Sequence, residues 1–150
     1  MNLAKVRQFR SAMRQFERVA NLQQKGCCSG VTLAQCLVLL EIEEHAGQTL
    51  RELSSRLRLD DSTLSRTVQG LVQKKLLERR QDEEDRRAIR LQLTSAGMAV
   101  CRSIHTENDA YCRRVFRRIS PARRRAVLRN FEILVQAYLD DEAASAGGSP

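Results

Sequence analysis

The sequence is poor in residues that interrupt helices and in large aromatic side chains. Its 150 residues include two prolines, seven glycines, no tryptophan and only 4% aromatic residues. So few helix-breaking residues favour a helical fold, and the core must consist mainly of Leu, Val, Ile and Ala. The length is enough for a single domain with a hydrophobic core.

The chain also lacks a long apolar segment. It has no run of about 18 apolar residues, so no transmembrane helix is predicted. The segment MNLAKVRQFRSAMRQF contains no apolar signal-peptide core. We therefore expect a cytoplasmic protein with no membrane partner. The sequence also has no phosphate-binding glycine loop, nucleophile elbow or H-E-x-x-H motif, which argues against an enzyme.

The chain has fewer acidic than basic residues. The chain has 26 Lys and Arg against 18 Asp and Glu, for a net charge of +8, and 22 of the basic residues are Arg. A basic excess of this size indicates a polyanionic partner, with nucleic acid the first expectation and a membrane surface the second.

Apolar residues at helical spacing predict a chain of helices. An amphipathic helix is expected over residues 3–24, and Ser120-Pro121 is typical of the start of a last helix, after a long helix from about 95 to 119. Two capping boxes, Thr32-x-x-Gln35 and Thr49-x-x-Glu52, predict two further helix starts. In the first of these helices the expected buried stripe is Leu33, Cys36, Leu37 and Leu40.

The central part of the chain predicts a winged helix-turn-helix. After the short helix at Thr49, Asp61 is expected to cap a second helix whose inward residues are Leu64, Val68, Leu71 and Val72. The segments LLERRQ and AIRLQL then alternate with period two, as a pair of strands does, with the charged turn DEEDRR between them.

The outward face of the second helix has the composition of a major-groove surface. Arginine pairs with guanine, glutamine pairs with adenine, and hydroxyl groups reach bases or phosphates. The predicted contacts are Ser62, Thr63, Ser65, Arg66 and Gln69. In the turn, Asp82 or Asp85 would hold Arg86 or Arg87 so that a guanidinium enters the minor groove. The alternative for each is a solvated polar surface.

Residues 50–100 resemble the MarR family of bacterial transcriptional regulators. The shared pattern combines the recognition helix, the D-x-x-D-R-R turn and a following L-x-L-T-x-x-G, although Lys75 stands where the family often has glycine. The resemblance implies a mainly α fold, a winged helix-turn-helix with a two-stranded β wing and N- and C-terminal dimerisation helices. It places one domain at 1–141, with the DNA-binding lobe at about 46–95 and dimerisation helices at about 3–24 and 96–141. The composition of the last segment, EAASAGGSP, predicts a flexible tail at 142–150.

The resemblance also implies a homodimer that binds double-stranded DNA. Two recognition helices would face successive major grooves, which predicts a pseudo-palindromic operator. Most family members repress, and an inducer releases them by favouring a state that does not bind DNA. Seven arginines between Arg113 and Arg125 would add phosphate contacts or form a solvated face. Their place in the dimerisation region favours the solvated face.

Five cysteines suggest a sensor, since disulfides are not expected in a reducing compartment. Cys27, Cys28 and Cys36 can converge, and Cys101 or Cys112 would join them, with nearby Lys and Arg favouring thiolates. Converging thiolates suit a soft metal or metalloid ion, or an oxidant. The alternative is that Cys36, Cys101 and Cys112 are small core residues.

Histidine and acidic residues give a second, weaker metal-binding hypothesis. Zinc-sensing members of the family make His45, His105 and Asp109 weaker metal candidates, although Cys28 would lie roughly 20 Å from His45 along a straight helix. The function could also be that of a repressor induced by a small aromatic ligand, with idle cysteines. A third alternative is a thiol metal-binding or redox protein that does not read DNA.

Overall fold

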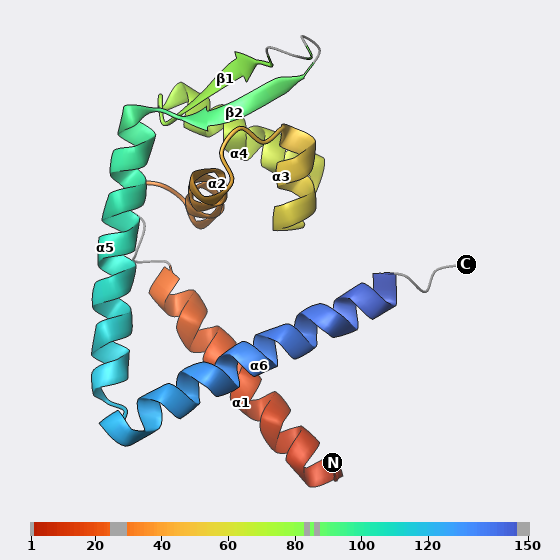
Figure 1. The fold of residues 1–150 in the computed structure, drawn as a ribbon, viewed down its shortest axis with the longest axis vertical. Helices are drawn as coiled ribbons and strands as arrows, with labels where there is room; N and C mark the ends of the chain where they lie inside the picture. Colours follow the sequence, from red (N-terminus) through yellow and green to blue (C-terminus); the bar gives the residue numbers. More distant parts are fainter. Residues whose placement is uncertain (1, 25–29, 83–84, 86–87, 147–150) are drawn as a thin grey trace. The chain divides into compact units, whose positions relative to one another are not determined.

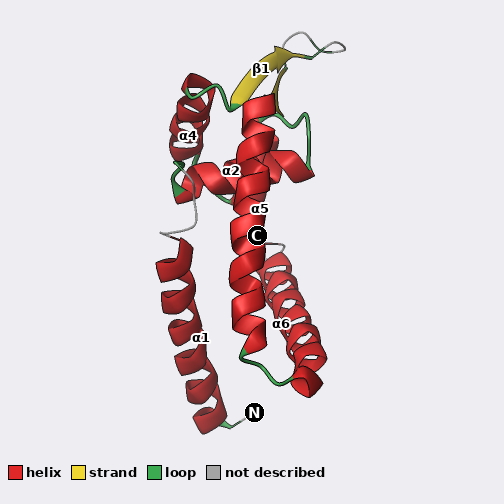
Figure 2. Cartoon of the chain, turned by 90° about the vertical axis from the view of Figure 1, so that its left-hand side faces the viewer, coloured by secondary structure: helices red, strands yellow, loops and turns green. Residues whose placement is uncertain are grey.

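The computed structural model describes residues 2–24, 30–82, 85 and 88–146 (Figure 1). Its elements in chain order are α1 (Leu3–Gln24), α2 (Leu33–Glu44), α3 (Leu50–Leu57), α4 (Asp61–Gln73), β1 (Leu77–Gln81), β2 (Ile89–Leu93), α5 (Ser95–Arg117) and α6 (Pro121–Ala146). Helices account for most of the described chain, and the two strands form one hairpin (Figure 2). The mainly α fold predicted from the sequence is confirmed.

The chain divides into two compact units, Met1–Asn108 and Asp109–Pro150, with the boundary inside α5. In the first unit, α2, α3, α4 and the hairpin form one lobe beside the N-terminal part of α5 (Figure 1). In the second unit, α6 continues to Ala146 and thus extends into the predicted tail at 142–150. Among the described residues, no helix is both long enough and apolar enough to cross a bilayer.

Both predicted capping boxes are present. The Thr32 hydroxyl accepts a hydrogen bond from the Gln35 backbone N–H at 3.2 Å, and the Gln35 side chain accepts one from the Thr32 N–H at 3.2 Å. Thr49 and Glu52 make the same reciprocal pair at the start of α3. Each box satisfies backbone donors that the first helical turn leaves without partners, so the local sequence determines where α2 and α3 begin.

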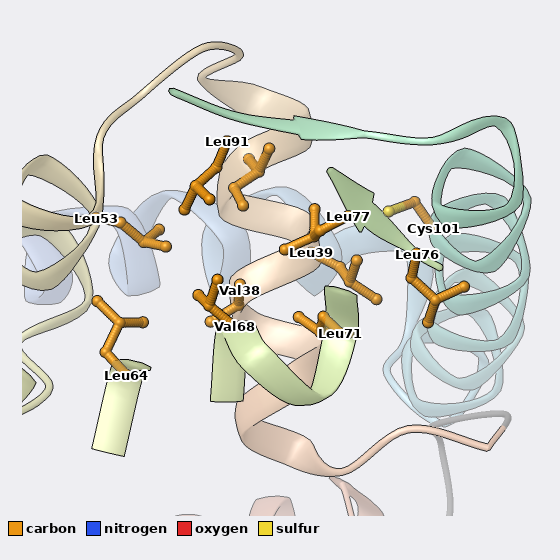
Figure 3. Packing of buried hydrophobic residues seen from close by; sticks show 11 residues of the cluster. Val38, Leu39, Leu53, Leu64, Val68, Leu71, Leu76, Leu77, Leu91 and Cys101 are labelled. Atoms are coloured by element: carbon orange, nitrogen blue, oxygen red, sulfur yellow. The ribbon is translucent and has the colours of Figure 1, made fainter. Parts of the chain in front are cut away.

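Leucines and valines from α2, α3, α4, β1 and β2 meet in the core of the lobe (Figure 3). Leu64, Val68 and Leu71 of α4 are fully buried, as their spacing predicts. Cys101 of α5 is also fully buried in this cluster. The buried face of α4 therefore fixes which of its side chains point outward.

The predicted face of α2 is partly wrong. Its buried residues are Cys36, Val38, Leu39 and Ile42, whereas Leu33 and Leu37 are 38% and 42% exposed. The sequence LAQCLVLLEIEE has apolar residues on every side of the helix, so spacing alone does not distinguish its faces. Contact with α3, α4 and β2 determines the buried face.

The junction between α4 and β1 has a left-handed residue. Lys75 adopts φ +57°, and the Leu76 N–H donates to the Leu71 carbonyl at 2.9 Å while the Lys75 N–H donates to the Val72 carbonyl at 2.9 Å. This pair of hydrogen bonds is the Schellman arrangement that commonly ends helices, in which glycine is the preferred left-handed residue. Lys75 adopts that conformation without the freedom of glycine.

The start of α5 is closely packed against the same junction. The Thr94 hydroxyl donates to the Lys75 carbonyl at 2.7 Å and accepts from the Gly97 N–H at 3.0 Å, while the Thr94 N–H donates to the Leu76 carbonyl at 3.1 Å. A Cβ atom added at Gly97 would lie 2.1 Å from the Leu76 carbonyl oxygen. The L-x-L-T-x-x-G pattern therefore joins the hairpin to α5 through backbone contacts that exclude a side chain at position 97.

Large apolar side chains are exposed on α1 and on α6. On α1 they are Leu3, Phe9, Phe16 and Val19. On α6 they are Val127, Leu128, Phe131, Ile133, Val135, Tyr138 and Leu139. An exposed apolar set of this kind is typical of a surface that contacts another protein chain.

Candidate nucleic-acid interface

The turn between α3 and α4 is fixed by side-chain hydrogen bonds. Arg58 ends α3 in the left-handed conformation at φ 51°. The Ser54 hydroxyl oxygen lies 3.0 Å from the Leu59 carbonyl oxygen and 2.6 Å from Asp61 Oδ1. Ser54 therefore links α3 both to the turn and to the first residue of α4, which holds the two helices of the motif together.

Asp60 caps α4, and the prediction that Asp61 does so is wrong. Asp60 Oδ1 accepts hydrogen bonds from the Ser62 hydroxyl at 2.6 Å and the Thr63 N–H at 2.8 Å. Hydrogen bonds from the side chains of Ser62 and Thr63, then the Thr63 N–H, hold the pKa of Asp60 well below its usual range. Two adjacent aspartates are equally good caps by sequence, and Asp61 instead accepts from Ser54.

The outward face of α4 is a polar ridge, which we define as Ser62, Ser65, Arg66 and Gln69. All four side chains are exposed, while Thr63, also predicted as a contact, is half-buried. Arg66 Nε donates to the Ser62 carbonyl at 3.1 Å, and Arg66 Nη2 lies 3.2 Å from Ser62 Oγ. The ridge therefore presents a guanidinium, an amide and hydroxyls on one helix face, the groups that pair with base edges and phosphates.

Arg90 links the end of the hairpin to the loop before α3. Leu77 pairs with Leu93 and Gln81 with Ile89 in antiparallel register. Arg90 Nε donates to Asp82 Oδ2, and Arg90 Nη1 donates to the Gly47 carbonyl at 2.8 Å. Asp82 is therefore paired with Arg90, a partner that the sequence did not indicate. Arg86 and Arg87, the predicted minor-groove residues, lie outside the described residues.

Arg90 stands directly opposite Arg80 in the ladder, which would place like charges side by side. Each has its own carboxylate: Arg80 Nη2 lies 2.6 Å from Glu78 Oε1, and Arg90 pairs with Asp82. The Asp82 side chain is 8% exposed, whereas that of Glu78 is 40% exposed. Sequence reasoning missed Arg90 because only the strand register brings it to Asp82 and to the loop before α3.

The three cysteines that the structure describes differ in their exposure to solvent. Cys36 and Cys101 are buried and Cys112 is exposed, while Cys27 and Cys28 lie outside the described residues. Burial, then the charge of Glu43, raises the pKa of the Cys101 thiol to about 11, contrary to the expectation that nearby Arg would favour its thiolate. Cys101 is therefore a packed core residue.

The weaker metal candidates have other partners. His105 Nε2 lies 2.6 Å from Glu43 Oε2, His45 Nε2 lies 3.8 Å from Glu41 Oε1, and Asp109 pairs with Arg113 at 3.2 Å. Among the described residues, no group of three or more His, Cys, Asp or Glu side chains is arranged to hold a metal ion.

Comparison with known proteins matches this lobe to one family. Residues 29–88 match the family model described as the MarR family. The resemblance to the MarR family is confirmed. A solved structure of a MarR family transcription regulator superposes with a TM-score of 0.80 over 97% of this chain and 95% of that chain, at 24% identity. This superposition shows that the winged-helix fold is shared.

Two curated proteins of Bacillus subtilis (strain 168) are similar in sequence. One is an organic hydroperoxide resistance transcriptional regulator, 34% identical over 67 residues, which cover 45% of this chain and 46% of the regulator. The other is the HTH-type transcriptional repressor MdtR, 35% identical over 68 residues, which cover 45% of this chain and 44% of the repressor. The match thus spans less than half the length of these MarR-type relatives, both named as transcriptional regulators and not as enzymes.

Proposed function

We propose that this protein is a sequence-specific, DNA-binding transcriptional regulator that acts as a repressor. The observation that supports this function most strongly is the polar ridge of α4. Its four side chains are exposed because Leu64, Val68 and Leu71 bury the opposite face in the lobe. The MarR-type relatives, one of them named as a repressor, support the same function.

We propose that the active form is a homodimer joined through the exposed apolar residues of α1 and α6. Seven large apolar side chains of α6 alone are at least 40% exposed in the single chain. Burying such surface in a second copy is favourable at about 25 cal/mol per Å². A two-fold dimer would present two polar ridges to a pseudo-palindromic operator.

The experiment that tests this function selects bound duplexes from a random pool with the purified full-length protein. We expect a single enriched motif that contains an inverted repeat. We also expect the DNA-binding species to have twice the mass of one chain. Phe131→Glu on α6 should yield a monomer with much weaker binding, while Gln136→Glu on the same helix serves as a matched control. Recovery of no preferred sequence would reject the proposal.

We propose that cysteine chemistry, by an oxidant or a soft metal or metalloid ion, releases the protein from DNA. The name of the hydroperoxide-resistance relative supports the oxidant. Because Cys36 and Cys101 are both buried in the core, the candidate thiols are Cys27 and Cys28 together with the exposed Cys112.

Substitution of Cys27 and Cys28 by Ser, with Cys112→Ser as a separate variant, tests the sensor. Operator binding is then titrated with peroxide, arsenite and zinc. We expect wild-type protein to release DNA with at least one agent and the Cys27/Cys28 variant to keep DNA bound. Failure of every thiol-directed agent to release the wild type would reject the sensor and leave a small aromatic ligand as the inducer to test.

A further inference from the structure

The turn between α5 and α6, inside the unit Asp109–Pro150, is strongly basic. Eight arginines and no Asp or Glu stand between Asp109 and Glu132. Exposed arginines at this density repel one another, so their presence together calls for either a local structural role or an anionic partner.

Several of these arginines have local structural roles. Arg124 Nε donates to the carbonyl oxygens of Phe116 and Ile119 at 3.0 Å each, and Arg117 Nε donates to the Arg113 carbonyl at 3.4 Å. Both satisfy backbone carbonyls near the end of α5. Arg113 pairs with Asp109, so these three side chains stabilise the helix end.

Three other arginines have no such role. The side chains of Arg118, Arg123 and Arg125 are exposed. Within the part of the chain that the structure describes, none of them makes a side-chain hydrogen bond or an ion pair. Their charges are therefore open to an external partner.

The position of Arg123 opposes local helix stability, and the helix end gives Arg125 no stabilising role. Arg123 lies in the first turn of α6 and Arg125 just beyond it, and that turn contains no acidic residue. The N-terminus of a helix has partial positive charge, so acidic residues are favoured there and basic residues are disfavoured. The stability of α6 does not explain these two arginines.

The neighbouring surface adds a further guanidinium and an aromatic ring. A shallow hollow of about 390 Å³ is lined by Tyr111, Arg114, Val115, Arg118 and Ile119. The Arg114 guanidinium lies over the Tyr111 ring, 5.7 Å from its centroid. This cation–π contact places the Arg114 charge at the same surface as Arg118.

We propose that Arg114, Arg118, Arg123 and Arg125 form a second DNA-contact surface, which binds the phosphate backbone of double-stranded DNA without reading its sequence. Guanidinium groups form paired hydrogen bonds with phosphate oxygens, and no carboxylate of this segment competes for them. Duplex DNA fits better than a lipid surface because the same chain has a winged-helix lobe. The surface goes beyond the proposed regulator function and does not require base recognition by α4.

The test measures binding of the full-length protein to duplex DNA of random sequence over a range of salt concentrations. The triple variant Arg118→Gln, Arg123→Gln and Arg125→Gln removes three charges and keeps side chains that suit helices. We expect the slope of log affinity against log salt to fall by about 2–3, since each lost phosphate contact removes about 0.9. The triple variant Arg7→Gln, Arg10→Gln and Arg14→Gln removes the same charge from exposed positions of α1 and is the control.

The control variant should keep the wild-type slope, and circular dichroism should show both variants folded. Equal slopes for the two triple variants would overturn the proposal. The proposal would also be overturned if the Arg118/Arg123/Arg125 variant lost binding to phosphatidylserine vesicles while its binding to DNA was unchanged. Base preference is measured separately, and its absence would reject the proposed regulator function. A reduced salt slope of the Arg118/Arg123/Arg125 variant on random DNA would still establish this second surface.

Discussion

The guanidinium of Arg66 is held against Ser62, one turn earlier on α4, with Nε 3.1 Å from the Ser62 carbonyl oxygen and Nη2 3.2 Å from Ser62 Oγ. The Ser62 hydroxyl donates in turn to Asp60 at 2.6 Å. This chain of contacts keeps the Arg66 charge near the N-terminal end of α4, the end that reads bases in helix-turn-helix proteins. A side chain ordered before binding loses less conformational entropy on the DNA.

Arg66→Ala should weaken binding to the preferred operator by about 1–3 kcal/mol and relax the base preference at one position in each half-site. The reason is the loss of a paired contact to a base. Titration of wild-type and variant protein on operator and random duplexes measures both effects. An equal loss on the two duplexes would mean that Arg66 contacts phosphate and reads no base.

Arg90→Gln should lower the free energy of unfolding by about 1–2 kcal/mol, because it removes the ion pair between Arg90 and the nearly buried Asp82 carboxylate. Arg80→Gln, directly opposite in the ladder, breaks an exposed pair with Glu78 and should cost less than about 0.5 kcal/mol. Urea unfolding of both variants measures the difference. Similar losses of unfolding free energy for the two variants would contradict a stabilising role for the pair of Arg90 and Asp82.

Gly97→Ala should lower the free energy of unfolding by about 2–3 kcal/mol, since its Cβ would lie 2.1 Å from a backbone carbonyl oxygen that cannot move alone. Gly70→Ala is the matched change. Its Cβ would lie 3.0 Å from the end of the flexible Gln35 side chain, and alanine favours the helix, so we expect a gain of about 0.5 kcal/mol. Thermal melts of both variants check the opposite signs.

Asp60 should make the stability of α4 depend on pH in acid. Its folded pKa is depressed, so its stabilising contribution is complete above the unfolded pKa, about 4. That contribution is lost as pH falls below this value toward the folded pKa. Asp60→Asn keeps a capping side chain that does not titrate. The difference in urea midpoint between wild type and this variant should be constant near neutral pH and shrink below pH 4. A difference in urea midpoint that stayed constant down to pH 2 would contradict this role of Asp60.

The sequence predicted the face of α4 because its apolar residues occupy one side only. Leu64, Val68 and Leu71 leave no second way to bury the helix. The same reasoning was partly wrong for α2, where Leu33 and Leu37 are as apolar as the buried Val38 and Leu39. A helix that is apolar on all sides takes its orientation from its neighbours, and those contacts are not local in sequence.

The helix cap and the hairpin also differ from what the sequence predicts. The sequence predicts the cap of α4 one residue late, because Asp60 and Asp61 have identical capping chemistry and only the backbone conformation separates them. Arg90 was missed because its contacts with Asp82 and Gly47 join segments separated by 8 and 43 positions. Local pattern thus identifies the recognition helix, and tertiary pairing determines what supports the hairpin.

Lys75 has a consequence for how this protein would respond to selection for heat tolerance. A residue other than glycine in the left-handed conformation costs roughly 1–2 kcal/mol, and glycine at position 75 would remove that cost. Part of this gain in stability would be lost, because glycine also gives the unfolded chain more conformational freedom. Lys75→Gly therefore offers a small net increase in melting temperature without touching the core or the polar ridge. Two nucleotide changes separate the lysine and glycine codons, so selection would reach this substitution late even though it adds stability.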